Sequence, residues 1–144
     1  MSRYAFAAIC ICTALAACDR APLPILLSDS CAVDVPARGG LVERGAKLHV
    51  GGWAFDRIAG NAPDNVHVQL VSEDQRTVKS FSAPRGRKRL DVVKAYGAPG
   101  AESSGFDVIL ETSALEPGRY AIYVLQGTHV KLLLCANDFH FFIK

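Results

Sequence analysis

The sequence predicts an all-β domain over residues 31–144, built as a single antiparallel β-sandwich. Three observations predict it. From Cys31 onward, apolar and polar residues alternate with a period of two, as they do in half-buried strands. Turn-forming residues recur about every eight to twelve residues, which is typical of two-sheet domains with short strands. The chain has 144 residues, of which 50% are hydrophobic and 21% are charged, and this composition suits one globular domain.

The expected strands are short and are separated by turns rich in Gly, Pro, Asp and Ser. They cover residues 31–35, 47–55, 66–71, 77–82, 106–110, 120–125, 130–134 and 139–143. Hairpin turns are expected at Ser72-Glu73-Asp74-Gln75 and at Gly127-Thr128, and one helical turn is expected over residues 90–96. The only tryptophan, Trp53, lies in the middle of an expected strand, and we expect its ring to fill the space between the sheets.

Four short motifs follow one another along this region. They are Gly52-Trp53-Ala54-Phe55-Asp56, Arg89-Leu90-Asp91-Val92, Ser104-Gly105-Phe106 and Leu115-Glu116-Pro117-Gly118-Arg119-Tyr120. Their order resembles an Ig-like β-sandwich module found in bacterial envelope and exported proteins, although Val93 replaces an alanine common there. The last motif is similar to a tyrosine corner. The resemblance spans residues 48–125 and implies an Ig-like fold with a structural or adhesive role and no catalytic residues.

The amino-terminal segment is typical of an export signal. Arg3 precedes an apolar stretch over residues 4–15, which is shorter than the roughly 20 residues needed to span a bilayer. The following Leu15-Ala16-Ala17-Cys18 resembles the lipobox of bacterial lipoproteins at all four positions. The resemblance implies that residues 1–17 are a cleaved lipoprotein signal peptide, and that Cys18 becomes a lipidated first residue carrying acyl chains such as palmitate. The alternative is plain secretion with a chance cysteine.

Residues 18–30 are expected to form a lipidated tether. Pro22 and Pro24 favour an extended chain of ~3.1 Å per residue, so the domain would lie within about 35 Å of the membrane. The run Ile25-Leu26-Leu27 is apolar for a tether. Two interpretations of this run stay open: contact with the lipid interface, or an edge strand of the domain.

Cysteine usage predicts one disulfide. Cys10 and Cys12 leave with the signal and Cys18 is modified, so Cys31 and Cys135 remain. An exported domain with two thiols usually pairs them. The bridge would join the first expected strand to the end of the penultimate one, or to the turn after it, and would stabilise the domain by ~2–5 kcal/mol. A redox-active pair is the alternative.

Positive charge is concentrated in one segment. Removing Arg3 from the 16 basic residues leaves 15 against 14 acidic residues, so the net charge indicates no polyanionic partner. Arg85, Arg87, Lys88 and Arg89, however, lie within five residues and are candidate anion-binding residues for an envelope glycan or lipid phosphate. The alternative is a solvated loop in which Arg89 pairs with Asp91 or Asp56. An exported protein is not expected to bind nucleic acid.

No residue spacing in the sequence is typical of an enzyme or a metal centre. Its histidines, acidic residues and serines match no zinc, calcium-loop or nucleophile-elbow pattern, so no catalytic residue, metal or cofactor is expected. The sequence therefore predicts a membrane-anchored envelope lipoprotein whose non-catalytic β-sandwich binds or scaffolds an envelope protein. Alternatives are recognition of an anionic glycan or lipid through residues 85–89, or a prophage-type exclusion lipoprotein. Asp19 favours the periplasm-facing inner membrane, and the outer membrane is the other location considered.

Overall fold

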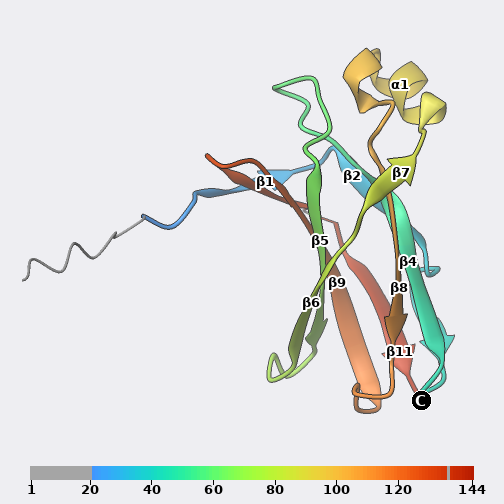
Figure 1. Ribbon diagram of the computed structural model, residues 1–144. Helices are drawn as coiled ribbons and strands as arrows, with labels where there is room; N and C mark the ends of the chain where they lie inside the picture. The colour runs from blue at the N-terminus through green and yellow to red at the C-terminus, as the bar shows by residue number, and fades with distance from the viewer. Residues whose placement is uncertain (1–20, 136) are drawn as a thin grey trace, which may run out of the picture.

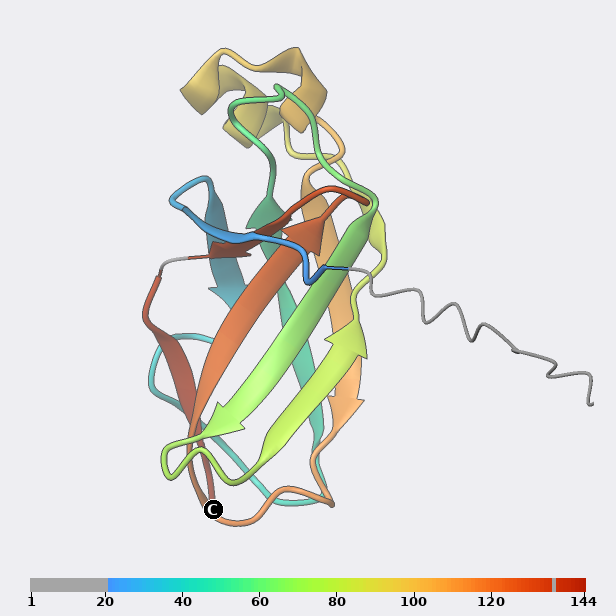
Figure 2. The same cartoon turned by 90° about the vertical axis from the view of Figure 1, so that its left-hand side faces the viewer.

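The computed structural model describes residues 21–135 and 137–144. The expected signal peptide, Cys18 and Asp19 lie outside the described residues. The described chain is mostly β and forms two sheets, of seven and four strands, with one α-helix and one short 3-10 helix at one end. Figures 1 and 2 show the two sheets as separate layers with the helices above them. The predicted all-β, two-sheet class is confirmed.

The strands of the larger sheet include both ends of the described chain. They are β1 (Ile25–Ser28), β3 (Gly40–Val42), β5 (Asn65–Ser72), β6 (Val78–Ser82), β9 (Gly118–Gly127), β10 (Leu132–Cys135) and β11 (Phe139–Ile143). The smaller sheet contains β2 (Cys31–Val35), β4 (Lys47–Ala54), β7 (Arg85–Arg87) and β8 (Gly105–Glu111). The helices α1 (Leu90–Tyr96) and η1 (Pro99–Ala101) lie between β7 and β8 in the sequence.

Strand β9 is the centre of the larger sheet. One edge of β9 pairs with the whole length of β5, from Asn65↔Gly127 to Ser72↔Tyr120. Its other edge is shared: the first half pairs with β11 and the last residues pair with β10. Because β10 and β11 separate along this edge, β10 leaves the body of the sheet and carries β1 with it (Figure 1).

The sequence predicts an entirely antiparallel sandwich, but two of the strand pairs in the structure are parallel. β1 pairs in parallel with β10, and β3 pairs in parallel with β11. Both parallel pairs lie at the margin of the larger sheet and join segments far apart in the sequence, so no local hairpin signal could predict them. The edge-strand interpretation of Ile25-Leu26-Leu27 is confirmed, and the second half of the expected tether is therefore part of the sheet.

The main core lies between the two sheets and follows the predicted alternation. Leu48, Val50 and Ala54 of β4 face inward residues of β5 and β9. The inward residues of β5 and β9 are Val66, Val68, Leu70, Tyr120, Ile122 and Val124, each with at most 2% of its surface exposed. Burial of these apolar surfaces is the main source of stability for the domain.

The prediction that Trp53 fills the space between the sheets is wrong. Successive strand residues point to opposite faces, so Trp53 points away from the face that carries Val50 and Ala54. Its ring instead packs against Phe55 and Tyr96, with ring centroids 6.1 and 5.5 Å away. Trp53 and Phe55 belong to a second, smaller apolar cluster, to which α1 contributes Val92 and η1 contributes Ala101.

Candidate functional site

The predicted disulfide is present and joins the two sheets. Cys31 opens β2 in the smaller sheet and Cys135 closes β10 in the larger one, with Cα atoms 6.0 Å apart. Both cysteines are buried. The bridge therefore ties the base of the β1–β10 pair to the opposite sheet, at the position that cysteine counting had predicted.

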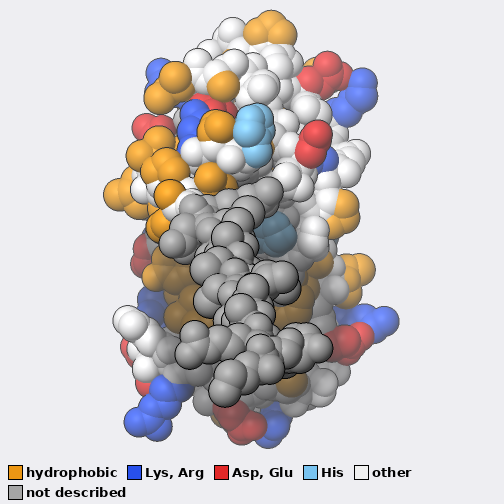
Figure 3. Space-filling model, turned by 60° about the vertical axis from the view of Figure 1, so that its left-hand side comes forward, with side chains coloured by type: hydrophobic (Ala, Val, Ile, Leu, Met, Phe, Trp, Pro, Cys, Tyr) orange, Lys and Arg blue, Asp and Glu red, His pale blue; other side chains and the backbone are white. Residues whose placement is uncertain are grey.

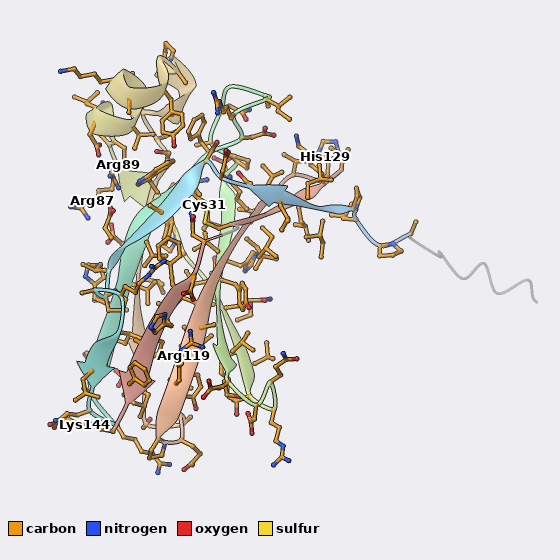
Figure 4. The ribbon with its side chains drawn as sticks, turned by 180° about the vertical axis from the view of Figure 1, so that it is seen from behind. Cys31, Arg87, Arg89, Arg119, His129 and Lys144 are labelled. Atoms are coloured by element: carbon orange, nitrogen blue, oxygen red, sulfur yellow. A yellow bond between two sulfur atoms is a disulfide. The ribbon has the colours of Figure 1, made fainter. Side chains whose placement is uncertain are left out.

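The β1–β10 pair projects from this base, and β10 is also paired with the last residues of β9. β1 pairs with β10 from Ile25↔Leu132 to Ser28↔Cys135, so residues 21–24 lie beside the turn over residues 128–131. The Leu132 N–H donates to the Pro24 carbonyl at 3.0 Å. Figure 4 shows His129 at the outer end of the ribbon and Cys31 at its inner end. We call residues 21–28, the turn over 128–131 and β10 the apolar ribbon.

Apolar side chains of the ribbon are exposed along residues 23–27 and in the turn, whereas Leu133 and Cys135 of β10 are buried. The exposed fractions are 38% for Leu23, 59% for Ile25, 46% for Leu26, 75% for Leu27 and 57% for Val130. Hydrophobic side chains gather on this side of the molecule in Figure 3. Single exposed apolar residues are ordinary, but a contiguous group on a protruding element is typical of an interaction surface.

The outer part of the ribbon carries no formal charge. Residues 21–28 contain no Asp, Glu, Lys or Arg, and Lys131 is the only such residue of the turn. The Lys131 ammonium lies 2.6 Å from Oδ2 of Asp56, whose side chain is 3% exposed. This ion pair holds the cation toward the body of the domain, so the tip is mainly apolar, with His129 as its exposed polar side chain.

The charge on Asp56 is stabilised where it is buried. Burial by itself raises the pKa of this carboxyl, but the Lys131 ammonium and the backbone N–H groups of Ala59 and Ile58 outweigh burial and lower the pKa below its usual value. Both N–H groups donate to Oδ1 at 3.1 Å. The ionised pair therefore connects the ribbon turn to the loop over residues 56–61.

A shallow groove lies beside the ribbon, where β10 and β11 separate. It has a volume of about 400 Å³, and its apolar lining includes Leu27, Ile122, Tyr123, Leu134 and Phe139. Leu27 belongs both to this groove and to the ribbon, so the two features form one continuous apolar surface.

The basic segment is mostly occupied by structural contacts, and part of it is strand β7, not a loop. The guanidinium of Arg85 donates to the Pro63 carbonyl at 2.8 and 3.0 Å and to the Ala54 carbonyl at 2.7 Å. It also donates to the Ser104 carbonyl and, at 3.0 Å, to Oε1 of Gln126 in the larger sheet. Burial lowers the pKa of Arg85 to about 10, although Asp64 opposes this shift, and the group stays charged at neutral pH.

Arg89 is likewise paired. Its guanidinium lies 2.6 Å from carboxylate oxygens of both Asp34 and Asp91, and its side chain is only 13% exposed. The hydrogen bond from Arg89 lowers the pKa of Asp91 to about 2. The expected pairing of Arg89 with Asp91 is confirmed, whereas pairing with Asp56 is wrong because Asp56 binds Lys131.

The four candidate anion-binding residues therefore do not form one open cationic patch. Arg87 and Lys88 are the exposed members, and each lies near a carboxylate: Arg87 is 4.0 Å from Asp107 and Lys88 is 2.7 Å from Glu102. Sequence reasoning missed the structural role of Arg85 because its acceptors are mainly backbone carbonyls, which leave no residue pattern.

Residues 21–135 and 137–144 contain neither a membrane-spanning helix nor a metal-binding cluster. Within these ranges, no helix is both long enough and apolar enough to cross a membrane. The same residues contain no group of three or more His, Cys, Asp or Glu side chains arranged to hold a metal ion. No protein-family model matches the chain, and no curated protein matches it in sequence.

Proposed function

We propose that this chain is a bacterial envelope lipoprotein. In this proposal residues 1–17 are removed and Cys18 is acylated, so the β-domain is held at a membrane surface. The observation that carries the proposal is the Leu15-Ala16-Ala17-Cys18 motif directly after an apolar stretch. The Cys31–Cys135 disulfide supports it, because structural disulfides persist in exported proteins and are rare in the cytosol.

We further propose that the domain is an Ig-like sandwich with a non-catalytic binding or scaffolding role toward an envelope protein. Two features support the Ig-like assignment. The two sheets enclose a common core, and the Tyr120 hydroxyl donates to the Glu116 carbonyl at 3.0 Å, as in a tyrosine corner. Trp53 departs from the Ig pattern, since it packs outside the main core. The inner membrane, favoured by Asp19, and the outer membrane are the proposed locations.

Recognition of an anionic glycan or lipid through residues 85–89 is the weaker proposal. Arg85 and Arg89 are engaged by acceptors within the domain, which leaves Arg87 and Lys88 to meet an anion. An exclusion lipoprotein of the prophage type is supported by no feature of the described residues. We therefore favour a protein partner.

The anchor is tested by replacing the modified residue in a bacterial host grown with labelled palmitate. The unaltered protein is expected to carry label and to sediment with membranes, and Cys18→Ser is expected to lose both properties. Cys12→Ser is the matched control, because it removes a cysteine of the apolar stretch and leaves the lipobox intact. An unlabelled parent protein, or a Cys18→Ser protein with parental label and sedimentation, would contradict the proposal.

A further inference from the structure

We propose that the apolar ribbon lies in the interfacial layer of a phospholipid bilayer and thereby orients the domain on the membrane. This inference rests on the proposed acylation of Cys18. It adds a second, non-covalent membrane contact, made by the folded domain itself, to the covalent one.

Chain length places the ribbon within reach of the membrane. An extended chain spans at most about 3.3–3.6 Å per residue, so Ile25 lies within about 25 Å of Cys18. The acyl chains of Cys18 would be buried in the bilayer. The tip of the ribbon cannot leave the vicinity of the lipid surface, whatever the orientation of the rest of the domain.

The chemistry of the ribbon suits this surface. Leu23, Ile25 and Val130 present exposed apolar side chains at or near its tip. No Asp, Glu, Lys or Arg occurs in residues 21–28, and the Lys131 ammonium is held by Asp56. Charges are costly in apolar surroundings, so an exposed tip on which His129 is the one titratable side chain besides the paired Lys131 favours contact with the polar–apolar interface of a membrane.

The backbone of the ribbon indicates how deeply the ribbon can enter the bilayer. In the described chain β1 pairs only with β10, so its outer edge carries unpaired N–H and C=O groups. Such groups are not tolerated in the hydrocarbon core but find water and head groups at the interface. Pro22 and Pro24 have no N–H, which reduces the number of donors at the tip. We therefore assign the ribbon to the interface, with side chains reaching the upper acyl region.

Quenching by lipid-borne nitroxides tests this placement on the full acylated protein. Ile25→Cys and Val130→Cys are labelled with an environment-sensitive dye, and the protein is placed in phosphatidylethanolamine–phosphatidylglycerol vesicles. Leu41→Cys and Ile109→Cys are matched controls, because the native side chains are 61% and 67% exposed outside the ribbon. The native disulfide and the acylated Cys18 leave the introduced cysteine as the one to be labelled.

We expect at least twofold stronger quenching at positions 25 and 130 than at positions 41 and 109. A nitroxide near the head groups should quench more than one near the bilayer centre. Equal quenching at ribbon and control positions would overturn the inference. A different result would also overturn the inference. If positions 25 and 130 are not quenched by the nitroxide lipids, but in detergent become protected from a water-soluble quencher as the protein concentration rises, the ribbon binds a second copy of the chain.

Intact mass of the same samples separates this inference from the proposed function. Acylated protein with an unquenched ribbon would overturn the inference alone. Protein without an acyl group at Cys18 would overturn the proposed function, and quenching at positions 25 and 130 would then show whether the ribbon binds lipid without the anchor.

Discussion

The basic segment and the apolar ribbon behave in the opposite way from what their composition suggests. Charged side chains of the basic segment make contacts within the domain, whereas apolar side chains of the ribbon are exposed. Arg85 is half-buried and donates to Pro63, Ala54 and Gln126, whereas Ile25 and Leu27 are exposed. The carbonyls around Arg85 need a donor with several N–H groups, and a guanidinium supplies it. Within the described chain, β1 is the edge strand of the larger sheet, and the side chains of Ile25, Leu26 and Leu27 stay exposed. The comparison teaches that side chains with partners inside the domain explain its stability. Apolar side chains that remain exposed indicate where the domain makes contact with another surface.

The disulfide at the base of the ribbon should give the largest effect on stability. Replacing both Cys31 and Cys135 with Ala removes a cross-link between residues separated by 104 positions. We expect the free energy of unfolding to fall by about 4 kcal/mol, because the unfolded chain regains the entropy of a long loop. Urea unfolding of the two proteins measures this difference, and a loss below about 1 kcal/mol would contradict the expected role of the bridge.

Arg85→Ala tests whether the basic segment stabilises the domain. The substitution leaves buried carbonyls without their donor, so we expect a loss of about 3 kcal/mol of unfolding free energy. Arg85→Lys should recover only part of this loss, since an ammonium cannot reproduce the planar array of donors. Urea unfolding measures both variants. Full stability of Arg85→Ala would show that the segment is free for binding after all.

The Asp56–Lys131 pair links the ribbon to the body of the domain, because it turns the Lys131 ammonium of the ribbon turn toward buried Asp56. The folded-state pKa of Asp56 is lowered, so its stabilising contribution is present above the unfolded pKa near 4 and is lost as pH falls through the folded pKa. We expect Asp56→Asn to cost about 1–2 kcal/mol at pH 7 and to weaken the loss of stability below pH 4. Denaturant unfolding between pH 7 and pH 2 measures both effects, and parallel curves for the two proteins would contradict the assignment.

Exposed residues of the two regions should affect stability least and differ only in lipid contact. Ile25→Ser with Val130→Ser, and Arg87→Gln with Lys88→Gln, should each change the unfolding free energy by less than about 0.5 kcal/mol. A dye attached at Leu27→Cys reports lipid contact in both double variants. Its nitroxide quenching should be lost in the Ile25→Ser, Val130→Ser protein and kept in the Arg87→Gln, Lys88→Gln protein. The reverse result would transfer lipid contact to the basic segment.

Strict alternation made part of the fold predictable from sequence. The alternation of Val66, Val68 and Leu70 predicted one strand, and residues 120–125 were predicted as another; the structure has both as neighbours in the larger sheet. The disulfide followed from counting cysteines, since two remained after the signal and the lipobox were set aside.

Other features depended on contacts between distant residues. The Arg-Gly-Arg sequence of β7 shows neither alternation nor strand-forming residues, so its pairing with β8 was missed. The parallel pairing of β1 with β10, and the Arg89–Asp34 ion pair, join segments that no local pattern relates. For the same reason, the sequence left the role of Ile25-Leu26-Leu27 undecided between an edge strand and a lipid contact.

The central claim is that a covalent lipid holds this domain at a membrane, and intact mass spectrometry of the mature protein purified from envelopes tests it most directly. The account predicts a chain that begins at residue 18 and is heavier than its amino-acid sequence by the mass of a diacylglyceryl group, with or without a further acyl chain on the amino terminus. A mature chain with no added acyl mass, or one that still contains residues 1–17, would contradict it.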